Sequence, residues 1–270
     1  MTAIEIHNLS YRYHDGTEAL KDVFLKVEKN KKVAILGANG SGKTTLLMHL
    51  NGLLAAQTGF VSVFGETITK KNLKNIRQKI GILFDNPDNQ LFSTSVFDDV
   101  AFGPYNMGFS ESEIEQRTHD ALMSVGIREL AEKPPHNLSL GQKKKAAIAG
   151  LLSMDMELYA MDEPFSGLDP KSVDEFFGIL DALYQRGCTL IISTHNVDLA
   201  YAWADDILIL GHGRVKAAGD FAILHDESLL VDSNLRLPNM VQIFSDTDYQ
   251  PRTPQEAKEC ISRMAFSPRR

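Results

Sequence analysis

A glycine-rich turn that ends in a lysine and a threonine places the strongest constraint on how this chain can fold. Residues 37–44 read Gly-Ala-Asn-Gly-Ser-Gly-Lys-Thr, which matches the pattern G-x-x-x-x-G-K-[ST]. The turn follows the apolar run 33–36 and precedes a helical run from Leu46 to Leu53. In that setting the backbone N–H groups can surround phosphate oxygens, and the start of the helix adds its positive dipole end. The sequence therefore predicts a strand, a phosphate-binding loop and a helix in that order.

Side chains of this loop have predicted roles in binding a nucleoside triphosphate. Lys43 would reach the β- and γ-phosphates, and the Thr44 hydroxyl would bind Mg²⁺. The alternative, a chance match, is disfavoured by the strand and helix on either side. The nucleotide-binding residues that we predict in this segment are Gly37, Ala38, Asn39, Gly40, Ser41, Gly42, Lys43, Thr44 and Thr45.

Apolar runs recur along the chain and alternate with helix-like segments, a pattern typical of an α/β fold. Strands that are apolar on both faces usually belong to a parallel sheet covered by helices. Residues 4–27 instead alternate in polarity around a turn at 14–17, which predicts a small antiparallel piece. The runs predicted to form the parallel sheet are 33–36, 80–84, 158–161, 189–192 and 207–210.

Helical patterns fill the stretches between these runs. Residues 86–154 predict a helical subdomain inserted into the sheet domain, and Ser110 with Glu113 predicts a capping box at one helix start. Another helix is predicted to open at Asp169. Beyond about residue 226 the chain becomes polar and contains several prolines, so we expect a short C-terminal appendage with a mobile end.

The composition excludes several classes of protein. The 28 Lys and Arg residues against 35 Asp and Glu give a net charge of −7, which disfavours a sequence-independent nucleic-acid binder. No apolar run approaches the roughly 18–20 residues that cross a bilayer, and the first residues lack the pattern of a secretory signal. The two cysteines, Cys188 and Cys260, indicate a reduced, cytosolic protein without a disulfide framework.

Polar residues follow two of the predicted strands. Asp162 and Glu163 come directly after the run 158–161. Asp162 is placed to hold Mg²⁺, and Glu163 would face the γ-phosphate and orient or deprotonate the attacking water. His195 lies just beyond another strand and could hold the water and Glu163 in line. The alternatives are a solvated acidic pair and a structural histidine; with the loop present we predict Glu163 and His195 as catalytic.

Taken together, these motifs resemble the ATPase subunits of ABC transporters. Residues 138–142, Leu-Ser-Leu-Gly-Gln, resemble the family's LSGGQ signature, and 166–169 resemble its D-loop. His195 resembles the switch histidine, and Tyr13 the aromatic residue that stacks on adenine. The resemblance covers about residues 3–225 and rests on six motifs in one order.

The resemblance implies an ABC-type P-loop NTPase: a RecA-like, mostly parallel core sheet, an N-terminal antiparallel β-subdomain and an inserted α-helical subdomain. It implies an ATP hydrolase that uses ATP and Mg²⁺ to drive transmembrane transport from the cytoplasmic face of the cell membrane. We expect an ABC domain over 3–240, with the helical subdomain at about 86–155, and a C-terminal extension over 241–270.

The resemblance also implies partners. Two copies would pack head-to-tail, and the second copy's signature would enclose ATP through Ser139, Gly141 and Gln142. A site at a helix start that no nucleotide can fill within one subunit fits that arrangement. We prefer a homodimer to a pair of different ATPases, together with integral membrane coupling and substrate-binding subunits and without nucleic acid.

Shorter segments resemble one branch of the family. Residues 86–92 and 98–104 resemble energy-coupling-factor importers, and 193–200 with 234–238 look most like their cobalt and nickel members. A vitamin importer or another ABC transporter is the alternative. We expect the stretch 86–105 to receive short helices of the membrane partners. We expect its phenylalanines to belong to the core rather than to the docking surface; they are Phe92, Phe97 and Phe102.

Two positions depart from the family pattern. Asp85 stands where relatives carry a glutamine that contacts Mg²⁺ and water, and we keep it as a catalytic and Mg²⁺-binding candidate with altered coupling. Leu140 replaces a glycine of the signature, which predicts a wider fit around phosphate or the weaker half of an asymmetric pair.

A soluble ABC ATPase acting on DNA or ribosomes is the distant alternative. Ser139 follows Lys43 by 96 positions, the stretch between them contains no sustained heptads, and the chain has a single ABC domain. The eight histidines are scattered without metal-ligand spacing. Substrate selection is therefore expected in other subunits.

Overall fold

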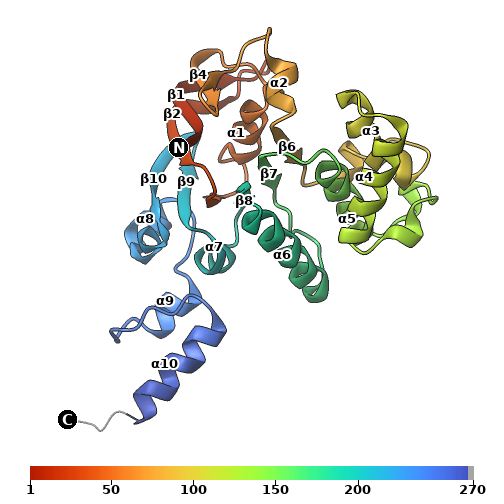
Figure 1. Ribbon diagram of the computed structural model, residues 1–270. Helices are drawn as coiled ribbons and strands as arrows, with labels where there is room; N and C mark the ends of the chain where they lie inside the picture. Colours follow the sequence, from red (N-terminus) through yellow and green to blue (C-terminus); the bar gives the residue numbers. More distant parts are fainter. Residues whose placement is uncertain (267–270) are drawn as a thin grey trace.

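The computed structural model, which describes residues 1–266, is built on a six-stranded sheet flanked by helices (Figure 1). Its order is β10-β9-β3-β8-β7-β6, and only β10 runs antiparallel to its neighbour. Every residue of β6, β7 and β8 is buried, as expected for strands covered on both faces. Each predicted apolar run forms one of the five parallel strands, so the α/β prediction is confirmed. The strands are β3 (Lys32–Leu36), β6 (Ile80–Leu83), β7 (Leu158–Asp162), β8 (Thr189–Thr194), β9 (Asp206–Gly211) and β10 (Arg214–Asp220).

A second, antiparallel sheet covers one side of the first and has the order β2-β1-β4-β5. Its strands are β1 (Thr2–Arg12), β2 (Glu18–Glu28), β4 (Thr58–Val63) and β5 (Glu66–Thr67). Helix α1 (Lys43–Leu50) lies between the two sheets, because Leu46, Leu47 and Leu50 share one buried cluster with residues of both. The helix begins and ends slightly earlier than the predicted run 46–53. This double burial holds the phosphate-binding loop rigidly against the core.

The inserted helical subdomain leaves the sheet after β6 and returns at β7, which is the neighbouring strand. It forms a separate body beside the sheet in Figure 1. The predicted capping box is present: the Ser110 side chain accepts from the Glu113 N–H, and the Glu113 carboxylate accepts from the Ser110 N–H. The helices are α3 (Val96–Met107), α4 (Glu111–Ser124) and α5 (Leu140–Leu152), with short 3₁₀ turns η1 (Pro87–Asn89), η2 (Arg128–Leu130) and η3 (Pro135–Asn137).

The remaining helices pack against the core sheet and its edges. Helix α6 begins where predicted, since the Asp169 side chain accepts from the Ser172 N–H at 3.0 Å. No helix within residues 1–266 is both long and apolar enough to span a membrane. These helices are α2 (Leu73–Arg77), α6 (Pro170–Gln185), α7 (Val197–Trp203), η4 (Phe221–His225) and α8 (Glu227–Asp232).

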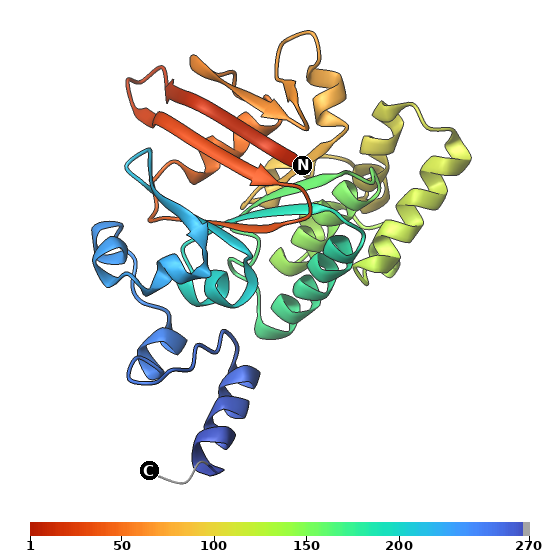
Figure 2. The same cartoon turned by 60° about the vertical axis from the view of Figure 1, so that its left-hand side comes forward.

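The C-terminal segment has more order than its composition suggested. It contains α9 (Asn239–Ile243) and α10 (Pro254–Phe266), which extend away from the sheets in Figure 2. Arg252 fastens the segment: its Nε donates to the Tyr201 carbonyl at 2.7 Å, a second guanidinium nitrogen donates to the Ala204 carbonyl, and it lies over the Phe221 ring. The mobile end that we predicted lies partly in residues 267–270, outside the described residues.

Candidate active site

The phosphate-binding loop leaves β3 and turns sharply into α1, and two of its glycines permit that path. A Cβ on Gly37 would lie 2.4 Å from the Leu210 carbonyl oxygen, and one on Gly42 would lie 2.5 Å from the Ala19 carbonyl oxygen. Gly42 also has a φ of +107°, in the left-handed region that favours glycine. The loop backbone therefore wraps closely around the start of α1, where N–H groups are available to an anion.

Lys43 is buried beneath this loop and is held by the loop itself. Its Nζ donates to the Gly37 carbonyl at 2.8 Å and to the Ala38 carbonyl at 3.3 Å. The same Nζ lies 3.7 Å from a carboxylate oxygen of Glu163. An ammonium group in this position can be shared between the loop, the carboxylate and a phosphate oxygen.

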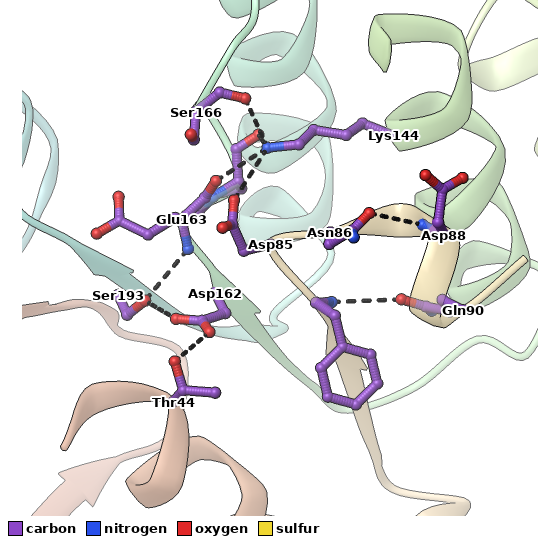
Figure 3. A network of polar contacts seen from close by, with 12 residues as sticks. Thr44, Asp85, Asn86, Asp88, Gln90, Lys144, Asp162, Glu163, Ser166 and Ser193 are labelled. Atoms are coloured by element: carbon purple, nitrogen blue, oxygen red, sulfur yellow. Dashed lines mark hydrogen bonds and ion pairs between the residues drawn. The ribbon is translucent and has the colours of Figure 1, made fainter. Parts of the chain in front are cut away.

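Asp162 lies at the end of β7 and joins two neighbouring segments through its carboxylate. Thr44 donates its hydroxyl to one oxygen at 2.5 Å, and Ser193 donates to the other (Figure 3). Hydroxyl and carboxylate oxygens are ligands that Mg²⁺ accepts, usually together with water and substrate phosphates. Among residues 1–266 no cluster of three or more His, Cys, Asp or Glu side chains could hold a metal by itself. The Thr44–Asp162 pair therefore fits a Mg²⁺ ion that is bound together with nucleotide.

Glu163 has an unusual backbone. Its φ is +41°, a left-handed conformation that costs a non-glycine residue about 1–3 kcal/mol and persists only where neighbours hold it. On one side its N–H donates to the Ser193 carbonyl at 3.1 Å and approaches the Ser193 hydroxyl at 3.2 Å. The half-exposed His195 ring places Nδ1 3.0 Å from its carboxylate. The carboxylate thus lies between Lys43 and His195, as a water-orienting group would.

On its other side Glu163 is held by Lys144, a residue that our sequence analysis did not single out. The Lys144 side chain is 1% exposed, and its Nζ donates to the carbonyls of Glu163, Pro164 and Ser166 at 3.1, 3.3 and 2.8 Å. Figure 3 shows this ammonium group between the carbonyls and Asp85. Burial lowers the pKa of Lys144, and the nearby carboxylates oppose that shift.

Asp85, our third candidate Mg²⁺ ligand, makes no hydrogen bond or ion pair with the other two, Thr44 and Asp162, within the described residues. Its half-exposed carboxylate lies 3.8 Å from Lys144 Nζ, its one polar partner within the described part of the chain. The conformation seen here therefore gives Asp85 a lysine as its neighbour.

The signature begins α5, as predicted, with Ser139 as the N-cap. Ser139 and Gln142 form a capping box: the Ser139 N–H donates to the Gln142 side chain at 3.0 Å, and the Gln142 N–H donates to the Ser139 hydroxyl at 3.3 Å. The N–H groups of the first helical turn, Gly141 among them, are the ones left to receive an anion. Within residues 1–266 no hydrogen bond or ion pair joins residues 138–142 to residues 37–45.

Leu140 sits at the first position of α5 with an ordinary negative φ, so this position does not require a glycine backbone. The side chain is 45% exposed and leans over Gly167, where a Cβ would lie 2.6 Å from a Leu140 methyl group. Leucine at 140 and glycine at 167 are therefore complementary in size within one chain.

Tyr13 lies just beyond β1, at the side of the loop. Its hydroxyl is 3.0 Å from the Thr45 hydroxyl, and its ring meets the Tyr11 ring edge-on at 5.1 Å. These contacts tie the tyrosine to α1. Adenine stacking by Tyr13 stays a prediction.

Two of the three phenylalanines that we expected in the core are exposed. Phe92 and Phe102 are 68% and 48% exposed and pack edge-on at 4.9 Å, and Tyr105 nearby is 71% exposed. Only Phe97 packs partly against the core. Our prediction failed because the hydrophobicity of a side chain does not show whether other residues cover it: Phe92 lies in the loop before α3, and Phe102 lies on an open face of that helix.

Sequence reasoning missed Ser193 and Lys144. Ser193 carried a weak signal, its position two residues before His195 at the end of a strand. Lys144 carried a better one: a run of three lysines, 143–145, directly follows the signature. Three consecutive residues of a helix point in different directions, so at least one of these lysines had to turn toward the body of the protein and find partners there.

Comparison with known proteins agrees with this geometry. The family model for "ABC transporter" matches residues 20–166. The energy-coupling factor transporter ATP-binding protein EcfA of Carboxydothermus hydrogenoformans is 45% identical over 267 residues, which cover 98% of this chain and 99% of that protein. EcfA of Methanosphaera stadtmanae is 47% identical over 250 residues, covering 92% of this chain and 90% of the relative.

Solved structures give the same result. CbiO1 of Clostridium perfringens, described as part of the ABC transporter complex CbiONQ, has a TM-score of 0.75 at 39% identity and covers 90% of this chain and 99% of its own. A bacterial ABC transporter cassette solved as a dimer has a TM-score of 0.74 at 26% identity, covering 81% of this chain and 98% of its own. The loop, the paired carboxylates, the signature and these similarities together establish that the chain belongs to the ATP-binding subunits of ABC transporters, which hydrolyse ATP to drive transport.

Proposed function

We propose that this chain is the ATP-hydrolysing subunit of an energy-coupling-factor-type importer that takes up a transition-metal ion, cobalt or nickel. The observation that carries the importer class is the end-to-end similarity to EcfA proteins, 98% of this chain and 99% of the relative. The likeness to CbiO1 and the segments 193–200 and 234–238 support the metal-ion branch. The candidate residues supply the hydrolysis, and within residues 1–266 no group of three or more His, Cys, Asp or Glu side chains could hold a metal-ion cargo.

In the proposed mechanism the loop N–H groups and Lys43 bind the β- and γ-phosphates of ATP. Thr44 and Asp162 would hold Mg²⁺, which neutralises phosphate charge when bound. Glu163 orients the attacking water and accepts its proton, and His195 keeps the carboxylate in place. Tyr13 stacks on adenine. Lys43 stays paired with Glu163 until the γ-phosphate offers it a stronger partner.

A second copy of the chain completes the site in this proposal. The start of α5 presents N–H groups to an anion, and within residues 1–266 no hydrogen bond or ion pair joins it to its own phosphate-binding loop, so a γ-phosphate held by one copy can also be bound by the other. Hydrolysis removes the shared ligand and reopens the pair.

The exposed rings of Phe92, Phe102 and Tyr105 form the proposed docking surface for the membrane partners. They lie on the segment between β6 and the end of α3, which also contains Asp85 near its start. Exposed aromatic residues in one patch are typical of protein contacts. We infer that short helices of membrane subunits bind here and hold the chain at the cytoplasmic face of the membrane.

Replacing both Phe92 and Phe102 by serine is expected to release the chain from its membrane partners while leaving its intrinsic ATPase rate within about twofold. Each buried aromatic contact in an interface is worth about 2 kcal/mol or more, and neither ring touches the catalytic carboxylates. Co-purification from membranes and ATPase assay of the released chain measure the two effects. The matched control is Phe60→Ser, a 41% exposed ring on β4. Retention of the double variant would remove this surface from the interface.

The proposal as a whole is tested by purifying the chain from membranes with its attached subunits and reconstituting the complex in vesicles. We expect ATP-dependent uptake of Co²⁺ or Ni²⁺ and a single kind of ATPase chain in the complex. Uptake of a vitamin instead would move the chain to the vitamin branch. A second, different ATPase chain would replace the homodimer by a heterodimer.

A further inference from the structure

The left-handed backbone of Glu163 contacts two neighbouring elements, and only one of these elements is a strand of the sheet. Ser193, on the neighbouring strand β8, receives the Glu163 N–H. Lys144, on the signature helix α5, binds the Glu163 carbonyl at 3.1 Å. The Glu163 carbonyl also accepts from the Ser166 N–H at 3.1 Å, a contact within the same turn, so Lys144 is the group that ties this carbonyl to another element.

Lys144 binds several backbone carbonyls of one turn. Its Nζ holds three carbonyls spread over residues 163–166, the whole turn that connects the catalytic carboxylate to the D-loop. With the side chain 1% exposed, the ammonium group has exchanged water for these oxygens and for Asp85 at 3.8 Å. Such an arrangement is rigid, since releasing any carbonyl leaves a buried charge less well paired.

The adjacent lysines make a useful contrast. Lys143 pairs with Asp88 of η1 at 2.7 Å, and Lys145 pairs with Glu175 of α6 at 2.5 Å. Both acceptors are exposed carboxylates. Only Lys144 turns inward to backbone oxygens beside the catalytic residue.

We propose that Lys144 is a positioning residue for ATP hydrolysis: it fixes the backbone of Glu163, with Asp85 as its counter-charge, and thereby ties the geometry of the base to the signature helix. The inference rests on the proposed role of Glu163 as the base. Asp85 begins the segment that leads to the proposed docking surface, so three functional regions meet at one ammonium group.

The test compares Lys144→Met with Lys144→Gln in the full-length chain. Methionine keeps the length of the side chain but cannot donate, whereas a glutamine amide can still reach part of the carbonyl set. We expect kcat to fall about 100-fold for methionine and about tenfold for glutamine, with KM for ATP within threefold, because displacement of a catalytic group by about 1 Å has effects of this size. Lys145→Met is the matched control and should keep kcat within twofold.

The split between kcat and KM distinguishes positioning from a general loss of structure, and thermal unfolding of each variant reports its folding. If one variant does not fold, the other decides, because both remove the ammonium group. Folded variants with wild-type kcat, or with a raised KM and unchanged kcat, would overturn the proposal.

Two further variants complete the design. Glu163→Gln, assayed in parallel, separates the two proposals. A wild-type kcat in Glu163→Gln would exclude Glu163 as the base. A lowered kcat in Glu163→Gln together with a wild-type kcat in Lys144→Met would overturn only the positioning role of Lys144. Asp85→Asn is expected to lower kcat about threefold in the wild type and to have no effect in Lys144→Met, since coupled residues are not additive. If Asp85→Asn changes kcat by the same factor in the wild type and in Lys144→Met, or changes it in neither, the proposed role of Asp85 is overturned.

Discussion

Replacing Glu163 with glutamine is expected to lower kcat for ATP hydrolysis by about 10²–10⁴-fold while ATP still binds. The amide fills the same space beside His195 and Lys43 but cannot accept a proton from water. Because the γ-phosphate then persists, the ATP-bound pair should accumulate, with a mass of two 30.0 kDa chains. Single-turnover hydrolysis and mass measurement in the presence of ATP and Mg²⁺ give the two readouts.

The matched control is Glu157→Gln. Glu157 lies just before β7 on the same segment, is 54% exposed and pairs with Lys29 at 3.6 Å, away from the loop. Its variant should hydrolyse ATP at the wild-type rate. Normal turnover in Glu163→Gln would exclude this carboxylate as the base and direct attention to another way of activating water.

The second large effect concerns binding. Lys43→Met is expected to weaken ATP affinity by about 10–100-fold, because hydrogen bonds to a charged group contribute about 1.5–3 kcal/mol each. The variant removes the one ammonium group that the loop carbonyls of Gly37 and Ala38 hold beside Glu163. Equilibrium titration with a fluorescent ATP analogue measures the affinity, and hydrolysis should fall with it.

Lys31→Met is a suitable control for Lys43→Met. Lys31 pairs with Asp206 at 3.5 Å on the surface, so its loss should leave ATP affinity unchanged. Wild-type affinity in Lys43→Met would mean that the backbone N–H groups alone bind the phosphates. That result would leave the loop geometry intact but remove the lysine from the nucleotide site.

The features that could be predicted from sequence are those encoded in short, local patterns. Five buried strands were predicted from continuous apolar runs. Ser110 and Asp169 predicted helix starts, because their side chains can accept hydrogen bonds from the unpaired N–H groups of a first helical turn. The phosphate-binding loop was predicted in the same way, from the eight consecutive residues 37–44 and the strand and helix on either side. In each case the cause and the effect lie within a few residues of one another.

The features that escaped prediction depend on which distant segments meet. Lys144 is a charged residue in a helix, and only the approach of residues 163–166 makes it a buried ligand of carbonyls. Phe92 has the same hydrophobicity whether covered or not, and its exposure depends on how the helical subdomain is oriented. Arg252 anchors the C-terminal segment by capping α7, a contact across 48 to 51 residues that no local pattern records.

The way in which the helical subdomain is attached has one more consequence. The subdomain leaves the sheet after Leu83, the last residue of β6, and returns at Leu158, the first residue of the adjacent parallel strand β7, so the whole insertion is one long crossover loop between neighbouring strands. Exchanging such a loop for another of different length costs little closure entropy and disturbs no strand order. A chimera that exchanges the residues between these two strands would therefore transfer the proposed docking surface together with Asp85, the signature and Lys144, so the parts proposed to bind partners and the parts proposed to act on ATP would change as one unit.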